Sequence, residues 1–182
     1  LEVMGRDAGH IALNAGIAGG ADVILIPEIP YSIKGIAKHI DSIRNKGRNH
    51  ALIVVAEAVK KEDGKKVTVK HVDGQVRLGG IGAYLGDEIY KLTDAETRVT
   101  VLGHVQRGAQ PTHRDRLIAS AFGVKAVDLI AEKKFNRVVV WKDRSVKDVS
   151  LNDIAGKSQT LSDKDPLIEV AKGLGIYIGE FN

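Results

Sequence analysis

The sequence contains no cysteine among its 182 residues, and only 4% of the residues are aromatic. The lack of cysteine excludes a disulfide framework, thiolate metal ligands and a cysteine nucleophile. It is compatible with the reducing cytoplasm, where we expect the protein to reside. With so few aromatic side chains, the core must be aliphatic. No apolar run approaches the roughly 18 to 20 residues of a membrane-spanning helix, so we expect no membrane partner.

The formal net charge is a modest +4. No block of lysine and arginine alternates with aromatic residues, so the sequence does not predict a surface for nucleic acid. The six histidines form no pair at metal-ligand spacing, and the H-E-x-x-H and G-x-S-x-G patterns are absent. We therefore expect no metal bound by this chain, and an anionic small molecule is the ligand class that the charge favours.

Short apolar segments alternate with helical patterns along the chain. Four segments are typical of strands buried on both faces: 23–26, 51–57, 99–102 and 137–141. Helices are predicted after Ser32, around Leu85 and Ile89, after Thr112 and after Asp165. This alternation predicts an α/β fold, with a mainly parallel sheet and helices on both faces.

Residues 60–75 interrupt this pattern with a run of charged residues. Val67 and Val69 alternate with polar residues, and Asp73-Gly74 is a turn signal, so we predict a surface hairpin there. Two glycine-containing segments imitate phosphate-binding loops without matching them. After Gly80 and Gly82, a dinucleotide loop needs its third glycine at position 85, which is Leu85. Gly156-Lys157-Ser158 lacks both the first glycine of a phosphate-binding loop and a preceding buried strand.

Charged side chains follow the ends of two predicted strands. Glu57 ends one strand, and His104 and Arg107 come just past the end of another. Carboxyl ends of parallel strands meet at one edge of a sheet, where ligands of open α/β folds lie. Arginine matches phosphate oxygens bidentately, and Arg6 joins this edge if its helix begins there. The alternative is a capped strand with two solvated cations.

Arg98 is different because it begins the strand that His104 follows. Six residues at about 3.3 Å each separate the two by roughly 20 Å. Arg98 is therefore either a surface cation or a group offered to another chain.

The sequence resembles the 6-phosphofructokinase family over essentially its whole length, and it matches the C-terminal part of that family's chain. The motifs that carry the resemblance are Glu2-Val3-Met4-Gly5-Arg6, Ile24-x-Ile26-Pro27-Glu28, Val54-Val55-Ala56-Glu57 and Thr100-Val101-Leu102-Gly103-His104-x-Gln106-Arg107-Gly108. The resemblance implies a phosphofructokinase-like but incomplete fold. It also implies a sugar-phosphate-binding domain of residues 1–105 and 157–182, with residues 106–156 returning to the nucleotide-binding domain.

The resemblance further implies a role for each matching residue. Met4, Gly5 and Arg6 would contact fructose 6-phosphate and the transferring phosphoryl group, with Arg6 as the catalytic residue. Glu57 would hydrogen-bond the sugar, and His104 and Arg107 would bind the 6-phosphate. Arg98 would reach the site of a neighbouring subunit in a homo-oligomer. Three residues fall where bacterial members bind a regulatory nucleotide: Asp22, Lys46 and Arg48.

The family's glycine-rich phosphate loops, and the aspartates that carry its catalytic base and magnesium ligand, lie outside this chain. The resemblance thus implies an enzyme that uses Mg²⁺ with ATP or pyrophosphate when intact, and a fragment that is inactive alone. The strand near Trp141 is expected to lack its partners here. Two alternatives remain: a non-catalytic sugar-phosphate or nucleotide-binding module, and a structural oligomerisation domain.

Overall fold

The computed structural model describes residues 1–70, 72, 74–162 and 164–179. The chain forms two compact units. The first comprises Leu1–Gln106 and Gln159–Asn182, and the second comprises Arg107–Ser158. Each unit is described by itself below.

A three-stranded parallel sheet forms the centre of the first unit, with the strand order β1-β3-β2. The strands are β1 (Glu2–Val3), β2 (Val23–Leu25) and β3 (Ile53–Ala56). Val3 pairs with Ala56, and Leu25 pairs with Val55. All strand residues but Ile53 are buried, because strands covered on both faces are built from continuous aliphatic runs. The strands predicted within 23–26 and 51–57 are therefore confirmed.

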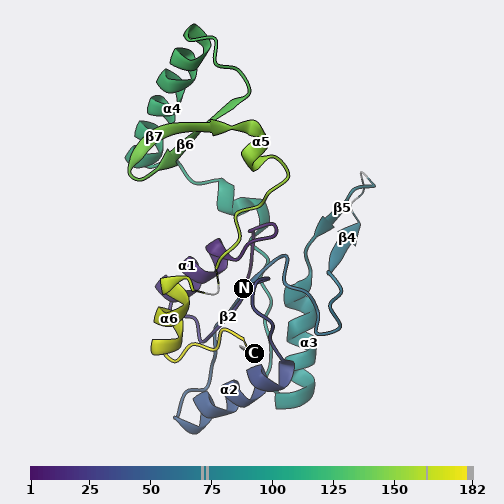
Figure 1. Ribbon diagram of the computed structural model, residues 1–182. Coiled ribbons are helices and arrows are strands. Elements are labelled where there is room, and N and C mark those ends of the chain that lie inside the picture. The colour runs from purple at the N-terminus through teal and green to yellow at the C-terminus, as the bar shows by residue number, and fades with distance from the viewer. Residues whose placement is uncertain (71, 73, 163, 180–182) are drawn as a thin grey trace. The chain divides into compact units, whose positions relative to one another are not determined.

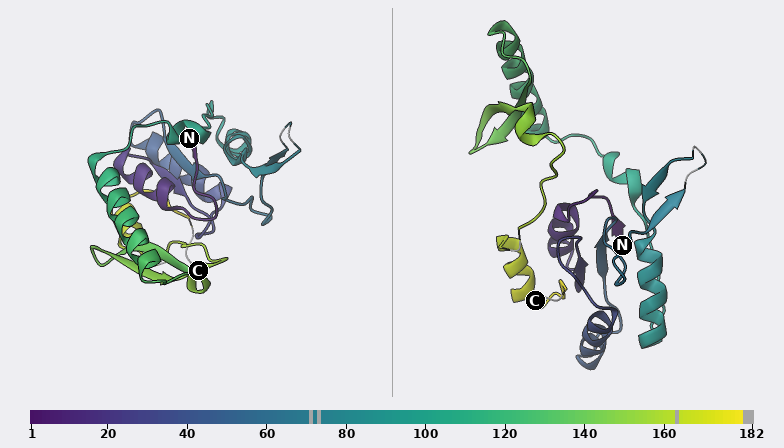
Figure 2. Two further views of the ribbon diagram at one scale, coloured as in Figure 1. Left: turned by 90° about the horizontal axis from the view of Figure 1, so that it is seen from above. Right: turned by 45° about the vertical axis from the view of Figure 1, so that its right-hand side comes forward.

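Helices cover both faces of this sheet, as predicted. Helices α1 (His10–Ala18) and α6 (Pro166–Gly173) lie together on one side, and α3 (Ile81–Thr93) lies on the other (Figures 1 and 2). Helix α2 (Ile33–Asn45) packs against α3. The Ser32 hydroxyl accepts the Gly35 N–H at 3.0 Å, and the buried isoleucines of α2 recur every three or four residues.

The buried Glu2 carboxylate holds the start of α3. It is only 2% exposed, and it accepts the N–H groups of Gly80 at 3.0 Å and Gly82 at 2.9 Å. Gly80 is the N-cap residue, with φ of 89° and no side chain to cap the helix. A Cβ on Gly82 would lie 3.2 Å from a Glu2 carboxylate oxygen. The glycines therefore allow the start of α3 to lie close to the Glu2 carboxylate. This structural role agrees with the mismatch of the segment to a dinucleotide loop.

The predicted hairpin is confirmed as two antiparallel strands, β4 (Thr68–Lys70) and β5 (Val76–Leu78). Lys70 pairs with Val76 at the last position of the ladder. Asp73, part of the predicted turn, lies outside the described residues.

The prediction of a buried strand at 99–102 is wrong. The segment forms a single parallel bridge, between Glu2 and Val101, and Val99 and Val101 are 42% and 56% exposed. Glu2 N–H donates to the Thr100 carbonyl at 2.8 Å, and Leu102 N–H donates to the Glu2 carbonyl at 3.1 Å. The pairing stops there because β1 is two residues long, and because the segment is the outermost member of the sheet within the described residues.

The second unit consists of one long helix, a hairpin and a short helix. Helix α4 (His113–Ala131) begins at the predicted Thr112, whose side chain forms a reciprocal capping box with Asp115. Strands β6 (Arg137–Lys142) and β7 (Ser145–Ser150) precede the short helix α5 (Leu151–Ile154). Leu129 is the buried residue of α4, whereas Leu117 and Val124 are 68% and 64% exposed.

The expectation that the strand near Trp141 has lost its partners needs one correction. β6 pairs antiparallel with β7 along its whole length, and β7 is its one sheet neighbour within the described residues. Asp143 and Arg144 connect the strands with φ of 51° and 59°, as in the two-residue turns whose twist matches a hairpin. The partner strand was missed because Ser145–Ser150 carries only two apolar residues.

No helix in the described ranges is both long and apolar enough to span a bilayer.

Replacing Glu2 with glutamine tests the capping of α3. The variant loses one acceptor and turns an amide NH₂ toward backbone N–H groups, so we expect it to lose about 1–3 kcal/mol of unfolding free energy. The exposed Glu169→Gln variant serves as control and should change by less than about 0.5 kcal/mol. Urea denaturation measures both. Equal effects of the two variants would contradict a structural role for the Glu2 carboxylate.

Candidate functional site at the ends of β1 and β3

The loop that follows β1 is held by the carboxylate at the end of β3. Oε1 of Glu57 accepts the Gly5 N–H at 3.1 Å and the Arg6 N–H at 2.9 Å. The two strands are parallel neighbours, so their carboxyl ends lie side by side. The structure thus brings together Glu57 and the Met4-Gly5-Arg6 segment. Within the described part of the chain, Glu57 Oε2 accepts no hydrogen bond.

The backbone of this loop turns sharply. A Cβ on Gly5 would lie 2.4 Å from the Ala8 carbonyl oxygen, and that residue's N–H donates to the Gly5 carbonyl at 3.1 Å. Arg6 has a left-handed φ of 52°. The Arg6 side chain is exposed, and no partner among the described residues engages its guanidinium. The loop therefore presents an uncommitted cation at the carboxyl edge of the sheet.

A second anchor of the loop comes from the 3₁₀ helix η1 (Gly103–Arg107). Gln106 Oε1 accepts the Met4 N–H at 2.8 Å. His104 lies in the same turn and is exposed. Gln106 appeared in the sequence as part of a motif, without a role, because nothing in a sequence indicates a partner 102 residues away.

Two further acidic residues near the loop are engaged by other groups of the first unit. Glu28 accepts the N–H of Gly9, the N-cap residue of α1, at 3.0 Å and the N–H of Leu161 at 2.9 Å. Asp7 pairs with Lys66 at 3.0 Å, so the acidic neighbour of Arg6 already has a cation. The Arg6 side chain therefore has no ion-pair partner among the described residues.

Arg107 is exposed and is the first residue of the second unit. Of the predicted site residues at this edge, Met4, Gly5, Arg6, Glu57 and His104 belong to the first unit, and Arg107 belongs to the second.

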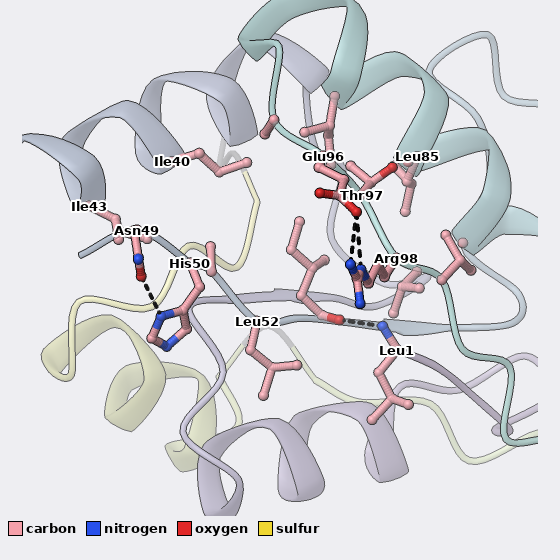
Figure 3. Close-up of a pocket in the computed structure, with 18 of the residues that line it drawn as sticks. Leu1, Ile40, Ile43, Asn49, His50, Leu52, Leu85, Glu96, Thr97 and Arg98 are labelled. Carbon is pink, nitrogen blue, oxygen red and sulfur yellow. Dashed lines mark hydrogen bonds and ion pairs between the residues drawn. The ribbon is translucent and has the colours of Figure 1, made fainter.

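Arg98 lies away from this edge, in a cavity of about 450 Å³ at the opposite end of β1 (Figure 3). Its guanidinium pairs with Glu96 at 3.0 Å, and the Arg98 side chain is 85% exposed. The same cavity holds Leu1, whose ammonium donates to the Ile53 carbonyl at 2.7 Å. Arg98 and the Met4–Arg6 loop thus lie at opposite ends of one strand.

Asp22 and Arg48 are brought together as a bidentate ion pair, at 2.6 and 3.1 Å. Leu52 N–H also donates to Asp22, at 2.8 Å. Burial alone would raise the pKa of Asp22, but the hydrogen bonds from Arg48 and Leu52 and the Arg48 charge outweigh it, and the pKa lies below its usual value. Lys46 is the exposed C-cap residue of α2.

Taken together, these features define an α/β protein that presents an exposed arginine at the carboxyl ends of parallel strands. The chain matches the family model described as phosphofructokinase over residues 1–130. It belongs to the phosphofructokinase family.

Similarity to known proteins extends over almost the whole chain. An "ATP-dependent 6-phosphofructokinase 1" from Nostoc sp. is 54% identical over 180 residues, which are 99% of this chain and 50% of that protein. The crystal structure of Pichia pastoris phosphofructokinase in the T-state is 29% identical, with a TM-score of 0.67, and the match covers 95% of this chain and 18% of that one.

A pyrophosphate-dependent phosphofructokinase from Marinobacter aquaeolei has a TM-score of 0.70 at 24% identity, over 97% of this chain and 43% of that one. At this identity the likeness shows the fold alone. The chain spans about half the length of the curated relatives it matches.

Replacing Gly5 with alanine tests the tight turn at the site. The added methyl would meet a backbone oxygen that cannot move aside, so we expect a loss of about 1–3 kcal/mol in stability. Gly173→Ala in the same unit meets nothing within 4 Å and should leave stability unchanged or raise it by up to about 1 kcal/mol. Thermal unfolding compares the two. Equal melting temperatures would argue against a close approach at Gly5.

The Asp22–Arg48 pair predicts a dependence of stability on pH. The pKa of Asp22 is lowered in the folded state. The contribution of ionised Asp22 to the free energy of unfolding is thus complete above the unfolded-state pKa of about 3.9. This contribution is lost as the pH falls through the folded-state pKa. At pH 7, the Asp22→Asn variant should have a free energy of unfolding about 1–3 kcal/mol lower than the wild type. Between pH 5 and pH 3, the free energy of unfolding should fall less in this variant than in the wild type.

Urea denaturation at several pH values checks this, with the exposed Asp41→Asn variant as control. Parallel stability curves for wild type and Asp22→Asn would contradict the assignment.

Proposed function

We propose that this chain supplies the fructose 6-phosphate site of a 6-phosphofructokinase. The intact enzyme would phosphorylate the 1-hydroxyl of fructose 6-phosphate to give fructose 1,6-bisphosphate in cytoplasmic glycolysis. The observation that carries the proposal is the loop at residues 4–6. Two side chains from distant elements anchor its backbone N–H groups, while the Arg6 guanidinium is left for an anion.

The chemistry of each residue suits a sugar phosphate. His104 and Arg107 would bind the 6-phosphate, since charge-assisted hydrogen bonds to phosphate are short and strong. Glu57 would accept sugar hydroxyls with Oε2, because Oε1 is engaged by the loop. Arg6 would stabilise charge that develops on the transferring phosphoryl group, with Met4 and Gly5 beside it.

Residues 1–105 and 157–182 would form the sugar-phosphate-binding domain, and 106–156 would return to the nucleotide-binding domain. Arg98 would serve the site of a neighbouring subunit in a homo-oligomer. Its exposed guanidinium, at the far end of β1, supports service in a site other than that of Glu57.

The intact enzyme would use Mg²⁺ with a phosphoryl donor, and the metal would supply charge neutralisation at the transferring phosphate. The described residues of this chain do not fit that ion. Glu28 and Glu57 at the carboxyl edge both accept backbone N–H groups, and the described residues form no acidic or histidine cluster of metal-ligand size. We therefore assign the metal and the catalytic base to residues outside this chain, and expect it to be inactive alone. The name of the Nostoc relative favours ATP over pyrophosphate as donor.

Nucleotide binding at Asp22, Lys46 and Arg48 is a second candidate function. Arg48 is half-exposed and Lys46 is exposed, which supports contact with a phosphate. Asp22 would have to exchange its bond to Arg48 for a nucleotide-bound metal. A module without catalytic function that binds a sugar phosphate or nucleotide is the corresponding alternative for the whole chain.

Calorimetric titration of this chain tests the proposed site. Fructose 6-phosphate should bind and fructose should not, because most of the affinity comes from phosphate contacts. Arg107→Ala should weaken binding at least tenfold, since a hydrogen bond to a charged group contributes about 1.5–3 kcal/mol.

Arg114→Ala removes an exposed arginine of the same unit and is the matched control. With Mg²⁺ and either ATP or pyrophosphate, the chain should form no fructose 1,6-bisphosphate. Equal binding of fructose, or no binding by the folded chain, would count against the proposal.

A further inference from the structure

Gln106 makes a hydrogen bond that joins two parts of the proposed substrate site. Its side chain is partly buried, and its Oε1 lies 2.8 Å from the Met4 nitrogen. A backbone N–H can only donate, so the amide oxygen must face it and the NH₂ group must point away. The orientation of the Gln106 amide is thereby fixed.

The need for this bond follows from the local backbone geometry. In a parallel ladder, alternate N–H groups of a strand point to the same side. Glu2 N–H donates to the Thr100 carbonyl, so the Met4 N–H points to the same side. A continued ladder would give it the Leu102 carbonyl. The chain turns at Gly103 instead, with φ of 50°, and that carbonyl accepts the Val105 N–H at 3.3 Å.

Gln106 therefore supplies the acceptor that the ended ladder no longer provides. The next two N–H groups, of Gly5 and Arg6, are taken by Glu57. Three consecutive N–H groups of the loop are thus held by side chains from two other elements. An unsatisfied N–H at this place would release the loop to rearrange.

We propose that Gln106 is a positioning residue for sugar-phosphate binding. Through Met4, it fixes the distance between the loop that presents Arg6 and the η1 turn that presents His104. Gln106 is also the last residue of the first unit, and Arg107 follows it in the chain. This inference rests on the proposed function, and it adds a residue to which no ligand contact is assigned.

The test uses the fact that Met4 is the only methionine in the chain. Labelling with ¹⁵N-methionine gives one backbone amide signal, which reports directly on this hydrogen bond. Gln106→Leu has a similar volume but no acceptor. It should shift the Met4 signal and raise its hydrogen-exchange rate at least tenfold. Affinity for fructose 6-phosphate should fall about tenfold, with its preference over fructose retained.

Two variants complete the design. Gln106→Glu keeps an acceptor oxygen, so the Met4 signal and exchange rate should stay as in the wild type. It is scored by the amide alone, because its charge also acts on an anionic ligand. Gln110→Leu, at an exposed glutamine, should change neither readout.

The outcomes separate the two proposals. An unchanged Met4 signal and exchange rate in Gln106→Leu would overturn the anchoring of Met4 by Gln106. Faster exchange of the Met4 amide in Gln106→Glu would overturn it as well. The glutamate variant alone tests the anchoring if the leucine variant fails to fold. If the Met4 amide of Gln106→Leu exchanges faster while the affinity for fructose 6-phosphate is unchanged, only the positioning role is overturned. Failure of the wild type to bind fructose 6-phosphate overturns the proposed function, and with it the role in substrate affinity, whereas the Met4 signal still reports the anchoring.

Discussion

Two successive backbone N–H groups donate hydrogen bonds to one carboxylate oxygen of Glu57, and this interaction determines the shape of the candidate site. Without it, the Gly5 and Arg6 N–H groups would lie past the end of β1 with no ladder partner. Because Glu57 ends β3 and the loop follows β1, the bond transfers the rigidity of the sheet to the loop. Residues on rigid elements hold a ligand geometry more accurately than free loops do.

Glutamates at distant positions in the sequence do similar work throughout the first unit. Glu2 holds the start of α3, Glu28 that of α1, and Glu62 accepts the N–H of Ile33 at the start of α2, at 2.9 Å. Each joins the free N–H groups of a helix to another element, where a carboxylate is also favoured by the helix dipole. The layers are therefore connected by polar bonds as well as by aliphatic packing.

The sequence predicted the elements whose pattern is local. Strands β2 and β3 and helix α2 are continuous apolar runs or regular isoleucine repeats, and they form as expected. Residues 99–102 look equally apolar, but their burial depends on a further neighbour at the sheet edge, which no local pattern reveals. Strand β7 was missed because its stability comes from pairing with β6 rather than from its own composition. In the site, the position of Glu57 was predictable from strand ends, whereas Gln106 was not, because its partner is set by the fold.

The backbone conformation at position 6 favours glycine, but the residue there is an arginine. A non-glycine residue in the left-handed region is strained by about 1–2 kcal/mol, and glycine adopts the same φ without that strain. Glycine at position 6 would therefore be the more stable choice for the fold. An arginine there gives up folding stability for a positive charge at the edge of the sheet. Under the proposed function, position 6 would thus be a point where stability and substrate binding oppose each other.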